Sequence, residues 1–255
     1  MSSPAPTASI PKTLFEATEQ AKLAVQAALA EGQTLLQVEM AIPELEHQPI
    51  AEQFLSILES QQFKVLFPDA GAAALARRDW GNPDFVIRGL GELAEPVEAD
   101  DDLYLVVNPS AIEVKEVEAL CNQVTDQAVV LLNPNLEDVA IIGIGYAGRQ
   151  LRERFINNIQ TCYYLRPLEG AAVYRCYPGP WQIWRETASD EYEWASDLPS
   201  RPSSEDIDRV LYGNAPAAAD ETTGEATANK ANSKATGRKR GIFAELQQFI
   251  RALTQ

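Results

Sequence analysis

Three glycines in the second half of the chain form a pattern that is typical of dinucleotide-binding turns. Gly143, Gly145 and Gly148 match G-x-G-x-x-G, directly after the apolar run 139–142 and before a helical pattern. Glycines at these positions let the backbone approach a pyrophosphate at the amino end of a helix. The pattern follows four or more predicted strands instead of opening the fold, and Pro167 with a predicted hairpin takes the place of the second strand. A glycine-rich structural turn therefore competes with nucleotide binding here.

Arginine and aromatic side chains gather immediately after these glycines. Residues 149–184 contain five Arg and no Lys, together with seven aromatic residues. Tyr, Trp and Arg are enriched in the hot spots of protein interfaces, but alternating Tyr and Trp in a hairpin also commonly form a packed face of a sheet. The residues predicted to bind a protein client are Arg149, Arg152, Arg154, Tyr177, Trp181 and Trp184. Packing is the alternative for the aromatic members, and ordinary ion pairs are the alternative for the arginines.

Further ligand-binding candidates lie where predicted strands end. Ligands of α/β proteins collect at the carboxyl ends of parallel strands, and the polar residues expected there are Asp69, Asn108, Asn133 and Asp138. Capping is the competing interpretation, because Asp and Asn at such positions commonly accept hydrogen bonds from the backbone of a helix or turn.

The chain offers few residues for catalysis. Its one histidine, His47, lies in a polar, Pro-flanked stretch that predicts a surface loop, and a single histidine removes most Ser-His and Cys-His schemes. Cys121, Cys162 and Cys176 form no C-x-x-C pair, which argues against a disulfide framework and against a zinc site. We predict a reducing compartment, no catalytic residue, no metal and no cofactor.

The acidic balance of the chain limits its partners. The 255 residues hold 37 Asp and Glu against 21 Lys and Arg, a formal net charge of −16, which disfavours nucleic acid as a partner. The first residues lack the basic and apolar segments of a secretory signal, and the longest apolar run, 139–148, is far shorter than the roughly 20 residues of a spanning helix. We expect a cytoplasmic protein that contacts membranes only at their surface.

Periodicity predicts an α/β domain over residues 12–213, after a flexible amino terminus of residues 1–11. Apolar runs of strand length alternate with helical patterns, which is typical of a Rossmann-like, mostly parallel sheet with helices on both faces. The predicted strands are 35–42, 63–67, 85–87, 103–107 and 129–132, and the predicted helices are 14–31, 51–61, 70–78, 111–125 and 150–157, with Thr13 and Asp69 capping the first and third helices. Residues 92–102 are expected to form a solvated acidic loop. Period-two patterns over 160–165, 172–176 and 182–185 then predict an antiparallel extension.

The composition changes after Gly213. Residues 214–240 have little apolar surface to bury, which predicts a disordered linker. In residues 241–255 apolar side chains recur at i, i+4, i+7, i+8 and i+11, which predicts an amphipathic helix behind a basic leader. The residues assigned to this membrane-binding or partner-binding helix are Arg238, Lys239, Arg240, Ile242, Phe243, Leu246, Phe249, Ile250 and Leu253. Packing of the helix against its own domain is the alternative.

Five phrases in the chain resemble, in this order, a family of unassigned function that is found in cyanobacteria and plastids. They are FPDAGAAALARRDW, LLNPNL, RERF, YYLRPL and AVYRCYPGPWQIW, and the resemblance extends over residues 12–186. Its members look like soluble Rossmann-like domains. One plastid branch comprises low-photosystem-II-accumulation-type assembly factors, and another is a domain appended to a chloroplast adenylate kinase. The resemblance implies a setting at photosynthetic membranes and brings no catalytic residues with it.

These observations lead to one functional hypothesis and one alternative. The hypothesis is a non-enzymatic accessory or assembly factor that binds a protein client and is tethered to a membrane or partner by its C-terminal helix. The resemblance implies photosystem II subunits as the client and the thylakoid as the membrane. The alternative is a nucleotide- or small-molecule-binding α/β enzyme with its site at the strand ends near residues 143–152.

Overall fold

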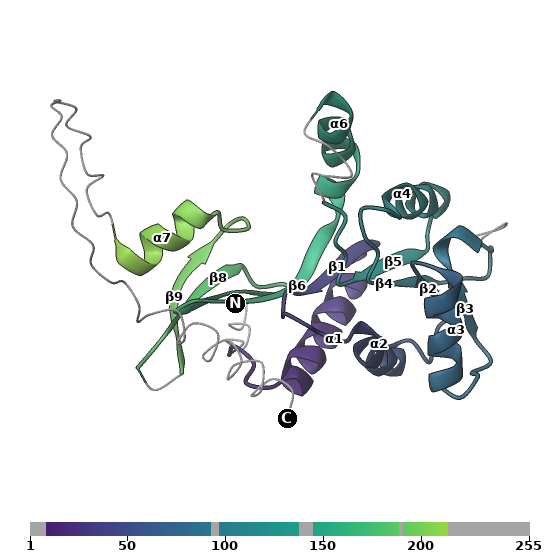
Figure 1. Ribbon diagram of the computed structural model, residues 1–255, viewed down its shortest axis with the longest axis horizontal. Helices are drawn as coiled ribbons and strands as arrows, with labels where there is room; N and C mark the ends of the chain where they lie inside the picture. The colour runs from purple at the N-terminus through teal and green to yellow at the C-terminus, as the bar shows by residue number, and fades with distance from the viewer. Residues whose placement is uncertain (1–8, 93–96, 138–144, 189–190, 214–255) are drawn as a thin grey trace, which may run out of the picture.

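A single mixed sheet of nine strands runs through the part of the chain that the structure describes (Figure 1). This computed structural model describes residues 9–92, 97–137, 145–188 and 191–213. The strand order is β3-β2-β4-β5-β1-β6-β7-β8-β9. The strands are β1 (Leu35–Met40), β2 (Phe63–Phe67), β3 (Val86–Gly89), β4 (Leu103–Val107), β5 (Ala128–Leu132), β6 (Gln160–Leu168), β7 (Ala171–Cys176), β8 (Trp181–Glu186) and β9 (Tyr192–Leu198).

Helices cover both faces of the parallel half of this sheet, from β3 to β6. The helices are α1 (Leu14–Ala30), α2 (His47–Phe54), α3 (Ala70–Asp79), α4 (Val114–Gln123), α6 (Tyr146–Arg154) and α7 (Ser204–Tyr212), with short 3₁₀ turns η1 (Leu55–Ile57), η2 (Leu90–Glu92) and η3 (Ile156–Asn158). The first three helices pack on one face, and α4 and α6 pack on the other (Figure 1). This arrangement confirms the predicted Rossmann-like α/β fold.

The two central strands β4 and β5 show why the sheet must be covered on both sides. In β4, Leu103, Leu105 and Val107 enter the core on the α1 side, whereas Tyr104 and Val106 enter the core below α4. All five residues of each strand are buried. Strands of this kind appear in sequence as continuous apolar runs, because neither face meets water.

Strand β1 is different, and this difference creates the candidate site. Its residues Leu36, Val38 and Met40 pack against the α1 side. The alternating residues, Gln37 and Glu39, are polar and lie on the opposite face, because successive side chains of a strand point to opposite sides.

Strand β6 joins the parallel half to the antiparallel half. It runs parallel to β1 and antiparallel to β7, and β8 and β9 continue the antiparallel pairing. Helix α7 packs on β8 and β9, where Ile207 contacts a small core formed by Tyr164, Val173 and Trp181. The predicted antiparallel extension is confirmed, with β9 and α7 added to it.

Both helix caps that the sequence predicted are present. The Thr13 hydroxyl accepts a hydrogen bond from the Glu16 amide, and the Asp69 carboxylate accepts from the amides of Gly71 and Ala72 at 2.7 and 2.9 Å. Helix α7 has a complete capping box, in which the side chains of Ser203 and Asp206 each accept from the other residue's backbone amide. This S-x-x-D pattern is a sequence signal for the start of α7, a helix that was not among those predicted.

Two sequence-based interpretations were wrong. His47 does not lie in a surface loop: it is the first residue of α2, which begins four residues before the predicted helix and accommodates Pro49 in its first turn. The stretch 92–102 is not wholly solvated, since Asp101 is buried against Lys64. The predicted linker and amphipathic helix, 214–255, lie outside the described residues. Within the described ranges, no helix is long and apolar enough to cross a bilayer.

Candidate functional site

The carboxyl ends of β1 and β5 form a topological switch point. The two strands are parallel neighbours, yet β1 leads to α2 on one face of the sheet and β5 leads towards α6 on the other. Chains that depart in opposite directions leave a crevice between them, and ligands of open α/β sheets bind in such crevices. The sequence indicated the strand ends as a site, but it could not show which two strands are neighbours.

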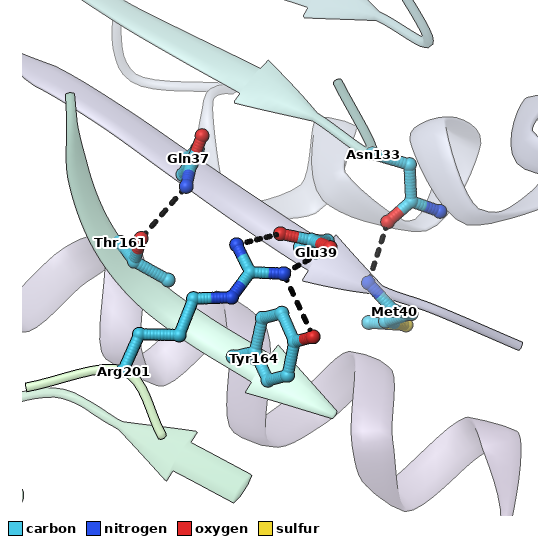
Figure 2. Close-up of polar contacts among 7 residues, drawn as sticks. All are labelled: Gln37, Glu39, Met40, Asn133, Thr161, Tyr164 and Arg201. Carbon is cyan, nitrogen blue, oxygen red and sulfur yellow. Dashed lines mark hydrogen bonds and ion pairs between the residues drawn. The ribbon is translucent and has the colours of Figure 1, made fainter. Parts of the chain in front are cut away.

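Asn133 closes this crevice on the α2 side. It follows β5 in a left-handed backbone conformation, with φ of 49°. Its side-chain oxygen accepts a hydrogen bond from the Met40 amide at 2.7 Å (Figure 2). Its side-chain nitrogen lies 3.2 Å from Nδ1 of His47. Burial lowers the pKa of His47, which favours a neutral ring that can accept this hydrogen bond. Asn133 therefore clamps β5, β1 and α2 together, as a turn residue with a structural role.

On the opposite face, polar side chains of β1 and β6 form two separate groups of hydrogen bonds, which together we call the polar network. Gln37 donates from Nε2 to the Thr161 hydroxyl at 2.7 Å. The Arg201 guanidinium donates to both oxygens of Glu39 at 3.1 and 3.2 Å and to the Tyr164 hydroxyl at 2.8 Å (Figure 2). It also lies over the Tyr164 ring, 4.4 Å from the ring centroid, so that one arginine makes ionic, polar and cation–π contacts. Arg201 comes from the segment between β9 and α7, far from Glu39 in the sequence.

Glu39 is the electrostatically unusual residue of this network. Burial raises its pKa, and the favourable interaction with Arg201 offsets this only in part. A carboxylate with a raised pKa at a switch point is a candidate functional group, because functional sites are where burial and charge are arranged to shift pKa values. No sequence pattern marked Glu39 or Arg201, since each is an ordinary charged residue until the fold brings the two together.

A polar pocket of about 250 Å³ adjoins this network. Its polar walls are Gln37, Glu39, Asn135, Glu137 and Arg201, and the remaining wall is apolar. Arg152 of α6 reaches the rim, where its Nε lies 3.4 Å from the Glu137 carboxylate.

The other predicted ligand residues have local structural roles. Asp69 caps α3, Asn108 is an exposed residue with a φ of 49° after β4, and Gly148 is buried within α6. Gly145 is the N-cap of α6 in an extended conformation, and a Cβ added there would meet nothing within 4 Å. Its geometry therefore does not require glycine. Gly143 and Asp138 lie outside the described residues, so nucleotide binding at this turn stays a prediction.

The three arginines of α6 that were predicted to bind a client do not form one surface. Arg154 makes a bidentate ion pair with Glu118 of α4 at 2.6 and 2.9 Å, Arg152 turns towards Glu137, and Arg149 is exposed. Between α4 and α6 lies an open groove of about 700 Å³ that Arg154 and Glu118 border. The apolar side chains of Ile112 and Tyr146 line this groove and are 71% and 72% exposed. We name it the α4–α6 groove; no pattern in the sequence predicted it.

The prediction that Trp181 and Trp184 bind a client is wrong. Trp181 and Trp184 are 4% and 8% exposed, so they cannot meet a client in this fold. The Trp181 ring packs 5.0 Å from that of Tyr164, and the Tyr177 hydroxyl donates to Glu31. The packed sheet face, the alternative interpretation, is what the structure shows. The exposed tryptophan of the extension is instead Trp194 on β9, at 54%.

Fold and site together define a Rossmann-like α/β domain with an antiparallel extension and a polar pocket at its switch point. The chain belongs to the family described as Domain of unknown function (DUF1995), whose model matches residues 11–209. This match confirms the resemblance at the level of an unknown-function family, and it extends through β9 into α7. A comparison with curated proteins found no match.

Proposed function

We propose that this protein is a non-enzymatic accessory factor that binds a protein client in the α4–α6 groove. The observation that carries the proposal is the exposure of Ile112 and Tyr146, two large apolar side chains that border the same concave surface. Apolar side chains that remain in water on a concave surface mark binding sites, because burying them against a partner is favourable.

The shape and charge of the groove fit an amphipathic segment of a protein. Its floor includes Val114 and Leu151, and its borders carry Lys115, Glu118 and Arg154. An apolar floor between charged borders is the arrangement by which grooves bind the apolar face of a helix. Arg149, exposed on the same helix α6, is available for a further contact with the client.

For the client we propose a subunit of photosystem II, and for the setting the thylakoid membrane. Support comes from the resemblance to low-photosystem-II-accumulation-type assembly factors, and the family match is compatible with it at a coarser level. The amphipathic pattern of residues 241–255 and its basic leader support a tether to an anionic membrane surface.

Site-specific photo-crosslinking tests the client-binding proposal. A photoreactive phenylalanine derivative replaces Ile112 in the full chain, and in a matched control it replaces Leu23, which is 64% exposed on α1 at the opposite face of the sheet. With solubilised photosynthetic membranes, we expect a discrete cross-linked photosystem II subunit from position 112 and none from position 23. Equal cross-linking from both positions, or none from position 112, would contradict the proposal.

Substitutions on α6, one in the groove and one outside its lining, give an independent test. Tyr146→Ala and Arg149→Glu should each weaken capture of the cross-linked client by on the order of 1–3 kcal/mol, because exposed aromatic and arginine side chains contribute most at interfaces. Trp181→Phe is the control, since Trp181 is buried in the extension and the variant should capture the client normally.

A further inference from the structure

The polar pocket beside Glu39 has the location and size of a site for a very small ligand. It lies at the switch point between β1 and β5, on the face that carries α6. Its volume of about 250 Å³ falls below the roughly 300–1,000 Å³ of pockets that take drug-sized ligands. The pocket that the described residues form is therefore too small to enclose a dinucleotide.

The charges of the pocket indicate which small ligand would fit. Glu39 and Glu137 contribute two carboxylates to the wall, and Arg201 contributes a guanidinium. A cationic ligand that displaced Glu39 from Arg201 would leave the guanidinium without its carboxylate, and an anionic ligand that displaced Arg201 would leave the largely buried Glu39 carboxylate without its ionic partner, which is costly. A ligand that carries both charges would replace the internal ion pair with two new ones.

Comparison with a second Arg–Glu ion pair shows that Arg201 only partly offsets the cost of burying the Glu39 carboxylate. Arg154 binds Glu118 at 2.6 and 2.9 Å, and its hydrogen bonds lower the pKa of Glu118. Arg201 binds Glu39 at 3.1 and 3.2 Å, which is longer than the roughly 2.7–2.9 Å of charge-assisted hydrogen bonds. Burial raises the pKa of Glu39 despite this partner. An additional donor near Glu39 would therefore be stabilised by the carboxylate.

We infer that the pocket binds a free α-amino acid or a zwitterion of the same chemistry. The ligand ammonium would donate to Glu39, whose side chain is 21% exposed, and its carboxylate would accept from Arg201, whose side chain is 48% exposed and accessible from the pocket. Gln37 and Asn135 supply neutral polar groups. Leu136 and Ile156 form the apolar wall, which favours a ligand with a small or medium-sized apolar side chain.

This inference is independent of client binding, because the pocket and the α4–α6 groove have no lining residue in common.

The twenty L-amino acids are screened against the full chain by thermal shift, and those that raise Tm are measured by isothermal titration calorimetry. We expect at least one with an apolar side chain to bind. For L-leucine, 4-methylpentanoate lacks the ammonium and 3-methylbutylamine lacks the carboxylate, and each should bind at least about tenfold more weakly.

Substitutions of pocket residues test whether the amino acid binds in this pocket. Arg201→Gln and Glu39→Gln should each weaken amino-acid binding at least about tenfold, because each removes one charge that the ligand requires. Arg209→Gln, which removes the arginine of the exposed Arg209–Asp206 ion pair on α7, should leave the affinity unchanged. If Glu39→Gln does not fold, as judged by circular dichroism, Gln37→Ala replaces it and should also weaken binding. The inference is overturned if no amino acid binds more tightly than about 1 mM, if the single-charge analogues bind equally well, or if binding persists in the folded pocket variants.

Discussion

Lys64 is a buried charge whose partners are defined by the fold. Its Nζ lies 2.7 Å from Asp101 and 3.1 Å from Glu98, and the Tyr104 hydroxyl donates to the same Asp101 carboxylate. Burial by itself would raise the pKa of Asp101, but the hydrogen bonds from Lys64 and Tyr104 outweigh it and lower the pKa. Burial and the Asp101 carboxylate raise the pKa of Tyr104, so its hydroxyl keeps its proton and remains a donor.

Asp101→Asn should therefore destabilise the domain by about 2–3 kcal/mol at pH 7, because the buried Lys64 ammonium loses its buried partner and keeps the largely exposed Glu98 carboxylate. Urea unfolding of the full chain measures the loss. The native pKa of Asp101 is depressed, so its contribution is complete above its unfolded pKa and is lost as pH falls through the native value. The stability gap between wild type and variant should consequently narrow below about pH 4. Asp100→Asn, at an exposed position, should change stability by less than about 0.5 kcal/mol; an equal loss from both variants would contradict the role of Asp101.

The thiols should be unreactive in the native protein. Burial raises the pKa of Cys162 to about 12, and burial together with the nearby Glu118 raises the pKa of Cys121 to about 12. Only the thiolate is nucleophilic, so iodoacetamide at pH 8 should label both thiols far more slowly in the folded protein than in urea. Mass spectrometry of the labelled peptides measures the two rates. Rapid native labelling of Cys162 would show that the core opens at β6.

At the scale of elements, β1 and β6 decide where polar chemistry can occur. Strand β1 has an apolar face against α1 and a polar face towards the pocket, and β6 supplies Thr161 and Tyr164 to the same polar surface. Helix α6 and helix α7 cover the sheet on either side of this surface (Figure 1). Neither strand could form the site alone, because the hydrogen bonds from Gln37 to Thr161 and from Arg201 to Tyr164 extend from one element to another.

The junction of β3 with α3 depends on a glycine. A Cβ at Gly89 would lie 2.7 Å from the Ala70 nitrogen and from the Asp69 carbonyl carbon, which are backbone atoms of the α3 cap. Gly89→Ala should destabilise the domain by about 2–3 kcal/mol, since the strand or the cap must shift. Gly91→Ala is the matched control, because its Cβ would meet nothing within 4 Å and should cost less than about 0.5 kcal/mol. Similar melting temperatures for the two variants would show that the junction adjusts freely.

At the scale of the whole molecule, the family match and the described fold end close together. The match covers residues 11–209, and the last described helix, α7, ends at Tyr212. The residues up to 213 carry 33 acids and 15 bases, whereas residues 214–255 carry 4 acids and 6 bases. The segment proposed to contact an anionic membrane thus differs in charge from the domain that precedes it.

Removal of residues 214–255 should leave the melting temperature of the domain unchanged and abolish co-sedimentation with anionic vesicles. In the full chain, Leu246→Asp should abolish co-sedimentation because it places a charge on the predicted apolar face, whereas Gln247→Ala should not. Charge reversal of Arg238, Lys239 and Arg240 should weaken it in a salt-dependent way. A truncated domain that melts several degrees lower, with unchanged sedimentation of the full-length variants, would show that the tail packs on its own domain.

The sequence by itself determined the local features of this protein. Apolar runs predicted the strands β4 and β5 because both faces of these strands are buried, and Thr13 and Asp69 marked helix starts because a cap acts within three residues. The switch from continuous to alternating apolar patterns likewise predicted the change from parallel to antiparallel pairing. Each signal depends on a few neighbouring residues, so it can be interpreted from the sequence without knowledge of the rest of the fold.

Only the tertiary structure decided which side chains meet. Glu39 and Arg201 form an ion pair across 162 residues of sequence, and their encounter depends on β6 lying beside β1 and on the segment after β9 returning to them. Trp181 and Trp184 have the composition of a binding surface, but Trp181 packs in a small core with Tyr164 and Val173, and Trp184 packs in the main core against Tyr174. The α4–α6 groove exists because two helices from different connections lie on the same face. Strand order and register fix all three outcomes, and these are set by long-range packing summed over the whole domain.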